Sequence, residues 1–186
     1  MRTSCVPQLK ELPREASIFS MQSNQEPKVR GILACARAYH GLGLAYLISI
    51  RKLANNNSED DTIIRNAEKA VELREQVGDF AAAGDSLNLL GSIYQCQKQY
   101  TKAEKYYLQS LKHRERVLSR FHPDLGQVSV SLGNLYCEMG EDSKAKDYFL
   151  SAHKIYCAAL GDDHPRVCYA LEGLAQVSCD GPPKFL

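Results

Sequence analysis

The sequence has no tryptophan, no Cys-x-x-Cys pair and almost no net charge, because 23 basic side chains oppose 22 acidic ones. This balance argues against a nucleic-acid-binding surface, which requires a marked excess of lysine and arginine. No apolar run approaches the roughly 18 residues that a membrane-spanning helix needs. We therefore expect a globular protein that neither binds nucleic acid nor inserts into a membrane.

Seven cysteines are present, but their number is odd and their spacing is not that of a disulfide framework. Residues 1–19 lack the unbroken apolar core of a secretory signal. We therefore expect a cytoplasmic protein with reduced thiols, in which Cys96 and Cys137 are partly buried and unreactive.

His122-Pro123-Asp124 has the order of the catalytic tripeptide of J-domain co-chaperones. In this chain, however, His-Pro returns 42 residues later as His164-Pro165, and the third position becomes Arg166. Proline suits the first turn of a helix and disfavours helical geometry at the residue before it. The two His-Pro pairs are therefore predicted to be structural joints, each of which begins a new helix.

The 42-residue offset also relates residues well away from the joints. Its matches are Leu90-Gly91 with Leu132-Gly133, Tyr94 with Tyr136, Ala103 with Ala145, and Tyr107 with Phe149. A period of this size is typical of stacked helix pairs.

The order Leu-Gly-x-x-Tyr, then Ala, then an aromatic residue four positions later resembles the tetratricopeptide repeat. The long period and the His-Pro joint are similar to the repeats of kinesin light chains and nephrocystin. The resemblance covers residues 84–178 and extends more loosely back to Val29, through Leu42-Gly43, Tyr46 and Ala67. The tryptophan position of the signature is the main departure; it holds Tyr39, Leu87, Ser129 and Leu171. The small Ser129 is expected to weaken one contact.

The resemblance implies an all-α fold, a right-handed α-solenoid of antiparallel helix pairs. Residues 1–27 would form an N-terminal segment, partly disordered or with one short helix, residues 28–179 the repeat domain, and residues 180–186 a tail. The predicted pairs are 28–54 with 60–77, 79–97 with 100–119, and 124–139 with 142–160, followed by a closing helix at 165–179. Helix ends are expected at Gly78, Gly140 and Gly161. The basic run at 112–120 is interpreted as the solvated face of a long second helix.

Such an array implies a non-enzymatic adaptor or scaffold that binds a segment of another protein in its concave groove. The first helix of each pair lines this groove, and its polar positions are the candidate site. They are Arg37, His40, Asn88, Ser92, Gln95, Gln127, Asn134 and Glu138, with Glu172 and Gln176 on the closing helix. Asn88 and Asn134 are the strongest candidates, because asparagine can pair with a peptide backbone without demanding a sequence. The alternative is that both are ordinary solvated residues.

The resemblance also implies a setting and two further possibilities. Motor-linked or ciliary scaffolds are the plausible surroundings, in the cytoplasm or on the cytoskeleton. A co-chaperone that captures the acidic tails of chaperones is the alternative function, but Val130 stands where such a clamp requires lysine. Apolar Leu171, Leu174 and Val177 on the closing helix could support self-association, or could mark a fragment or isoform of a longer array.

One set of residues has the spacing of a zinc site. His153 and Cys157, like His164 and Cys168, lie four residues apart. We favour a structural role, because His164 matches His122, which has no cysteine partner. We therefore predict no metal and no other cofactor.

Neither a catalytic group nor a phosphate-binding loop is recognisable. Serines such as Ser92 and Ser131 have no His–Asp partners in the pattern. The glycine-rich stretch at 41–47 lacks the lysine of a phosphate-binding loop and reads as part of a helix. We therefore predict that the chain is not an enzyme.

Overall fold

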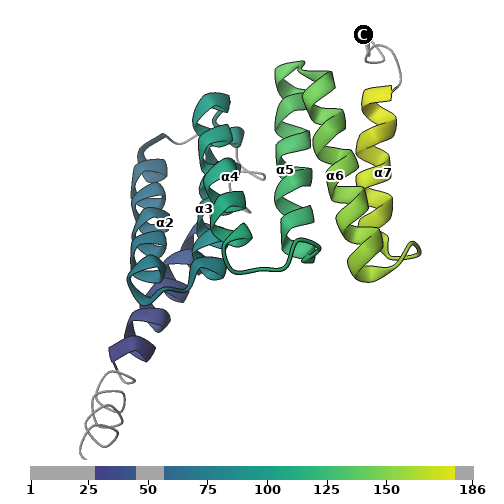
Figure 1. Cartoon of the computed structure of the whole chain (residues 1–186). Coiled ribbons are helices and arrows are strands. Elements are labelled where there is room, and N and C mark those ends of the chain that lie inside the picture. The colour runs from purple at the N-terminus through teal and green to yellow at the C-terminus, as the bar shows by residue number, and fades with distance from the viewer. Residues whose placement is uncertain (1–27, 45–56, 179–186) are drawn as a thin grey trace, which may run out of the picture.

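The computed structural model describes residues 28–44 and 57–178, which form a row of helices (Figure 1). The helices are residues 28–44, α2 (Asn57–Val77), α3 (Phe80–Cys96), α4 (Tyr100–Glu115), α5 (Pro123–Met139), α6 (Asp142–Leu160) and α7 (Pro165–Ser178). No strand occurs among these residues. The predicted all-α array of helix pairs is confirmed.

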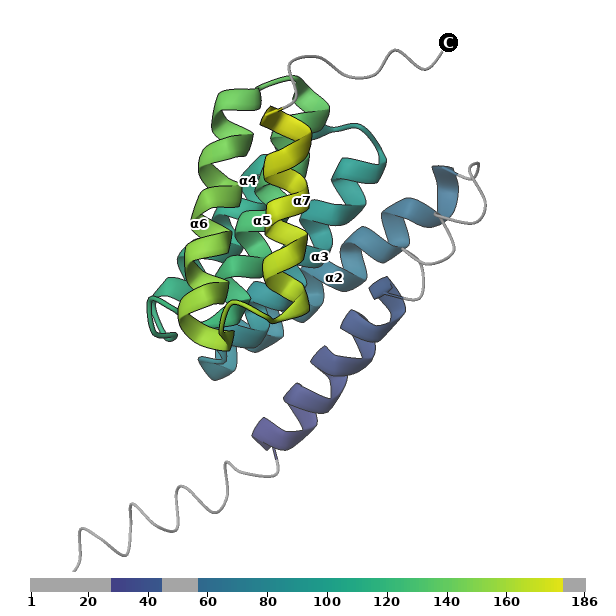
Figure 2. The ribbon, with the colours of Figure 1, turned by 90° about the vertical axis from the view of Figure 1, so that its right-hand side faces the viewer.

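Successive helices pack side by side, so that each pair stacks on the next. The stack runs from α2 to α7, and the helix of residues 28–44 crosses it obliquely at the N-terminal end (Figure 2). Within the described ranges, no helix combines the length and the apolar character needed to cross a bilayer. The predictions for residues 1–27, for the end of the first helix beyond residue 44 and for the tail at 180–186 lie outside the described residues.

Most predicted helix boundaries agree closely with the structure, but the prediction for α4 is wrong at its C-terminal end. The helix stops at Glu115 instead of running to residue 119, and the chain turns as Leu118 N donates to Arg114 O over 2.8 Å. Lys112, Arg116 and Arg120 of the basic run are exposed as predicted, but Arg114 departs from the prediction, since it is 2% exposed. The Arg114 guanidinium donates to Asp124 O over 2.6 Å, which draws the connection back onto α4.

Both His-Pro joints begin helices, as predicted. His122 is the N-cap of α5, and its Nδ1 accepts a hydrogen bond from Asp124 N at 3.3 Å. His164 does the same before α7, accepting from Arg166 N at 3.1 Å. Each histidine therefore satisfies one of the unpaired amides at a helix start, while the proline that follows needs none.

The two helices of each pair meet where a glycine faces an aromatic ring. A Cβ on Gly91 would lie 2.5 Å from the Tyr107 ring, and one on Gly133 would lie 2.7 Å from the Phe149 ring. Ala103 is fully buried, as is its counterpart in the next pair. The close packing expected from the sequence pattern is confirmed, and a larger side chain at either glycine would force the helices apart.

Three turns between helices share one geometry. Gly78, Lys98 and Gly140 have φ angles of 80°, 57° and 75°, in the left-handed region. Each donates its amide to the carbonyl three residues earlier, and the residue after it donates five residues back, as in Gly140 N to Cys137 O and Glu141 N to Tyr136 O. Gly78 and Gly140 were predicted helix ends, whereas lysine at position 98 gave no such signal.

Lys98→Gly should stabilise the protein, because lysine pays a steric cost in the left-handed region that glycine does not. We expect the free energy of unfolding to rise by about 0.5 to 1 kcal/mol, since part of the gain is offset by the greater backbone freedom of glycine in the unfolded chain. Denaturant unfolding would measure the change. Gly140→Lys is the matched control and should lower stability; no gain from the first variant would contradict the strain argument.

Candidate functional site

Two rows of side chains run across the first helices of successive pairs. The 42-residue offset places Ser92, Asn134 and Gln176 in one row on α3, α5 and α7. Aligning Leu42-Gly43 with Leu90-Gly91 places His40 and Asn88 together in a second row. Side chains in one row lie on the same face of neighbouring helices, so polar groups far apart in sequence line one surface.

This surface is hollowed in two adjoining places. The smaller hollow has a volume of about 170 Å³ and lies among the helix of residues 28–44, α3, α4 and α5. The larger has a volume of about 600 Å³ and extends across α3, α4, α5 and α7. Ser92 lines both. Together they form one groove, which we call the concave groove.

Most of the predicted site residues lie in this groove. The smaller hollow contains His40, Asn88, Ser92 and Gln127, and the larger contains Ser92, Gln95, Asn134, Glu138 and Gln176. Arg37 and Glu172 line neither hollow. Arg37 is exposed, and its Nε donates to Leu33 O on its own helix at 3.4 Å.

A chain of hydrogen bonds fixes the floor of the larger hollow. Ser92 Oγ lies 3.0 Å from the Tyr107 hydroxyl, which donates to Gln95 Oε1 at 2.8 Å. Gln95 Nε2 then donates to Glu138 Oε1 at 2.7 Å, which joins α3 to α5. Tyr107 was predicted only as core packing, and nothing in the sequence pattern showed that its hydroxyl would reach the groove. The connected side chains leave the floor rigid and polar.

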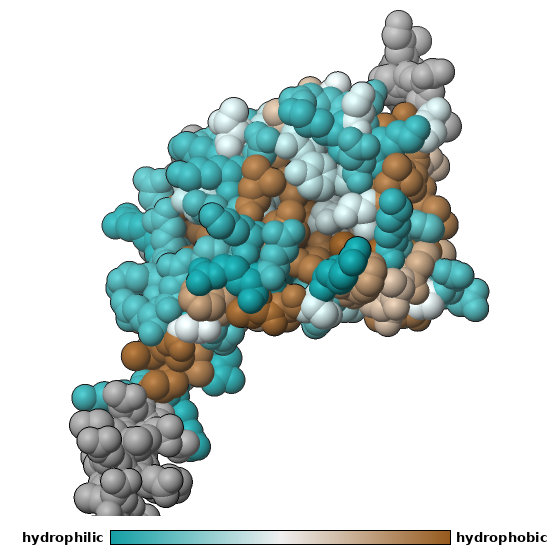
Figure 3. All heavy atoms as spheres, in the orientation of Figure 1, coloured by the Kyte–Doolittle hydropathy of each residue, from teal (hydrophilic) through white to brown (hydrophobic). Residues whose placement is uncertain are grey.

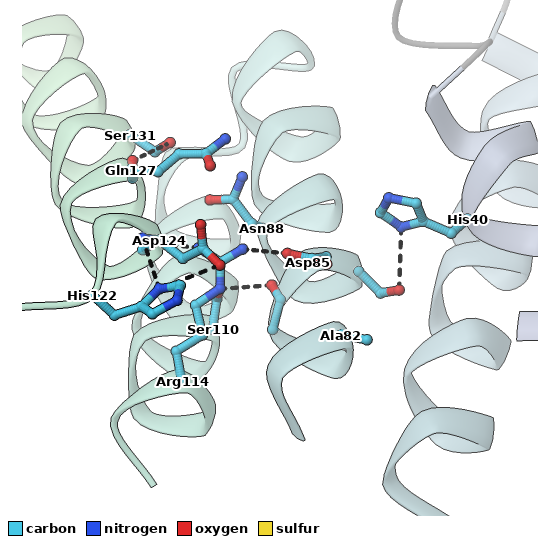
Figure 4. A network of polar contacts seen from close by, with 12 residues as sticks. His40, Ala82, Asp85, Asn88, Ser110, Arg114, His122, Asp124, Gln127 and Ser131 are labelled. Atoms are coloured by element: carbon cyan, nitrogen blue, oxygen red, sulfur yellow. Dashed lines mark hydrogen bonds and ion pairs between the residues drawn. The ribbon is translucent and has the colours of Figure 1, made fainter. Parts of the chain in front are cut away.

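Asn88 presents an unpaired acceptor in the smaller hollow. Its Oδ1 is buried and has no hydrogen-bond partner among the described residues. Figure 4 shows Asn88 and Gln127 pointing toward one another across the space between α3 and α5. Because an unsatisfied buried acceptor costs about 1 to 3 kcal/mol, an N–H group from a bound segment would be favoured at this position.

Below Asn88, a buried guanidinium ties three helices together. Arg114 on α4 pairs with Asp85 on α3 over 2.5 Å and donates to Asp124 O at the start of α5 over 2.6 Å (Figure 4). Its side chain crosses Gly84, where a Cβ would lie 2.8 Å from Arg114 Cγ. The sequence held a signal for this position, because the 42-residue offset equates Arg114 with Tyr156, which packs on Gly126 in the same way.

Comparison with known proteins identifies the repeats of this array. Residues 82–158 match the family model of the tetratricopeptide repeat. Residues 82–158 are therefore tetratricopeptide repeats. The match contains the whole of α4 and α5 and most of α3 and α6, which are the two pairs that follow the 42-residue offset. No curated protein matches significantly.

Solved structures with a similar fold cover a larger part of the chain than the family match does. Two are of nearly identical repeats assigned to a Podosopora anserina kinesin light chain, with TM-scores of 0.61 and 0.60 at 18% and 19% identity. Each covers 76% of this chain, which spans 64% of theirs. BtubC from P. vanneervenii has a TM-score of 0.50 at 17% identity, covering 80% of this chain and 65% of its own. The predicted resemblance to kinesin-light-chain repeats is confirmed as a likeness of fold.

A second buried arginine supports the N-terminal end of the repeat groove. Arg74 on α2 donates from Nη1 to Ala82 O at 2.6 Å and to Ser86 Oγ at 2.7 Å. Ser86 Oγ lies 3.3 Å from His40 Nδ1. Burial lowers the pKa of His40, and nearby Arg74 lowers it further against an opposing effect of Asp85. His40 is therefore predominantly neutral at physiological pH and contributes a hydrogen-bonding ring rather than a charge.

The residues with zinc-like spacing are His153, Cys157, His164 and Cys168. No group of three or more metal-ligating side chains occurs within 28–44 and 57–178. Cys157 Sγ does approach His153 Nε2 at 3.5 Å, but His164 caps α7 instead. Burial raises the pKa of Cys137, and Asp142 and Glu138 raise it further, so this thiol resists ionisation. Cys96 is exposed, contrary to the prediction of partial burial.

Arg114→Ala should destabilise the repeats, because it leaves Asp124 O without its donor and opens a hole over Gly84. We expect a loss of about 2 to 4 kcal/mol in the free energy of unfolding, toward the lower end because water can still solvate the half-exposed Asp85. Arg114→Tyr is the matched variant and should lose less, since Tyr156 fills the equivalent site. Denaturant titrations compare the two; equal losses would contradict the proposed equivalence.

Acid should destabilise the repeats through His40. Its folded pKa lies below the ordinary value of 6.5, so the unfolded chain binds the proton more readily. The stability tied to neutral His40 is therefore complete above pH 6.5, falls as the pH drops through that value, and is lost below the lowered folded pKa. Unfolding free energies from about pH 8 to about pH 5, measured beside His40→Gln, would isolate this contribution. A His40→Gln curve parallel to that of the unchanged protein would refute it.

Proposed function

We propose that this protein is a non-enzymatic adaptor that holds an extended segment of a partner protein in the concave groove. The observation that carries the proposal is the continuity of the groove, in which two hollows joined at Ser92 extend from His40 to Gln176. A polar channel of this length suits an extended chain, whose backbone presents donors and acceptors at regular intervals.

The chemistry of the groove favours recognition of the backbone. Asn88 offers an unpaired acceptor, and Asn134 is exposed on the rim of the larger hollow. The two arginines beneath the groove are engaged, Arg114 with Asp85 and Arg74 with Ser86. Neutral amides outnumber free charges at the surface, so specificity would come from shape and from apolar positions such as Leu44.

The cellular setting that we propose for this adaptor rests on its similarity in fold to other repeat structures. The similar Podosopora anserina structures are of kinesin-light-chain repeats, which is compatible with a cytoplasmic, motor-linked or ciliary scaffold. A co-chaperone role has weaker support, because capture of an acidic tail requires several free cations. Lys98 is the only lysine or arginine lining either hollow that is not held in an ion pair among the described residues.

Self-association through α7 is a separate part of the proposal. Leu171 is 47% exposed on this helix, and Cys168 and Ala175 are also exposed. In register, these positions correspond to Ser129, Gly126 and Gly133 on α5, where α6 packs. A second helix could therefore cover the same face of α7.

Random peptides displayed on phage and selected on the intact chain would test the groove. Selected peptides should bind Asn134→Arg at least tenfold more weakly, because the long side chain obstructs the larger hollow. Ala159→Arg is the matched control; it places the same side chain at an exposed position of α6 that lines neither hollow, and should bind normally. Calorimetric titration gives both affinities. Equal binding to both variants, with unchanged helicity, would place recognition elsewhere and defeat the proposal.

A further inference from the structure

A second groove lies on the opposite, convex side of the array, between α4 and α6. It has a volume of about 570 Å³. Its floor comes from α5 through Leu125 and Ser129, and the α4–α5 connection closes one end through Leu118 and Phe121. In Figure 3, apolar surface interrupts the polar face over α4 and α5 and near their connection. We call this feature the α4–α6 groove.

The chain contains its own reference for this groove, one repeat earlier. The hollow between α2 and α4 is lined by Leu87, Tyr106, Gln109 and His113, and the 42-residue offset converts these into Ser129, Tyr148, Ser151 and Ile155, all of which line the α4–α6 groove. The earlier hollow measures only about 190 Å³. The two grooves are therefore equivalent in position and differ in how far they are filled.

Two side-chain differences account for the open groove. Leu87 is buried in the earlier hollow, whereas Ser129 leaves its floor empty and bonds only to Leu125 O at 3.0 Å. His113 Nε2 reaches Glu75 Oε1 at 2.7 Å and ties α4 to α2, but Ile155 has no polar atom to do so. Tyr106, which donates to Glu68 at 3.1 Å, is retained as Tyr148 and does not distinguish the two grooves. The earlier groove is narrowed by leucine and by the bond between His113 and Glu75, and the α4–α6 groove has neither.

Apolar side chains project beside the open groove. Phe121 lines it and is 44% exposed, and Val117 in the same connection is 49% exposed. A large exposed side chain next to an unfilled apolar hollow supplies both halves of a packing contact. Between two chains, the exposed Phe121 of one can enter the hollow of the other.

The charges around the groove identify the occupant. Glu115, Arg120, Asp147 and Lys154 line it, and none of them forms an ion pair within the described residues. Two acidic and two basic groups can pair with a surface that carries the same two acidic and two basic groups. A partner surface with charges of one sign would repel two of the four. The net charge of +1 also creates little repulsion between copies. A surface that is complementary to itself is the requirement for a two-fold contact.

We infer that a second copy of this chain docks on the α4–α6 groove, with Phe121 of each protomer inserted into the groove of the other. The inference is independent of the proposed groove function. The contact uses the convex side, so both concave grooves remain accessible and the dimer can engage two partner segments at once.

Sedimentation of the full chain over micromolar to submillimolar concentrations tests the inference. A reversible dimer is expected. Ser129→Leu places the residue of the earlier repeat on the groove floor, and should weaken dimerisation at least tenfold while preserving helicity and thermal stability. Ser129→Ala is the matched control, because it keeps the floor open and should dimerise normally. Phe121→Ser should weaken dimerisation as Ser129→Leu does.

Two results would overturn the inference. The chain could remain monomeric throughout the concentration range. The dimer could instead persist in both Ser129→Leu and Phe121→Ser; its disappearance in Leu171→Ser would then place self-association on α7.

Discussion

The contact between a glycine on one helix and a bulky side chain on the next determines how closely each pair packs. Gly91 receives Tyr107 and Gly133 receives Phe149, at separations that leave no room for a Cβ. Because consecutive pairs share this contact, they stack in register, and residues 42 positions apart come to lie side by side. The concave groove and the α4–α6 groove both follow from this spacing, since each is the space that remains on one side of the stacked pairs.

Seven residues before each of these glycines is a second one, and here the repeats diverge. Gly126 receives the ring of Tyr156, whereas Gly84 receives the guanidinium of Arg114. An arginine fills part of the same space and adds polar bonds to Asp85 and Asp124. The arginine at this packing position thereby links α3, α4 and α5 beneath the concave groove. The cost is a buried Nε without a partner among the described residues, which an aromatic ring would not incur.

The sequence predicted those features that depend on residue type and spacing. The His-Pro helix starts, the glycine contacts and the left-handed Gly78 and Gly140 are of this kind. Features that depend on where a neighbouring element lies were missed: α4 ends early because its connection bonds to Arg114, and the Tyr107 hydroxyl reaches the groove because Gln95 accepts from it. Lys98 was missed for another reason, since its left-handed turn is imposed by the flanking helices rather than by lysine itself.

Ser129 shows how a small departure from a repeat pattern acquires meaning in three dimensions. In the sequence it is one weak match at a position usually held by a large residue. In the structure its counterpart Leu87 is buried in a groove that the bond between His113 and Glu75 also closes, and in the later groove Ser129 and Ile155 supply neither filling. The two changes act on the same space, because both residues line the α4–α6 groove. A departure from the repeat pattern therefore opens a groove only where the neighbouring helix also leaves the space unfilled.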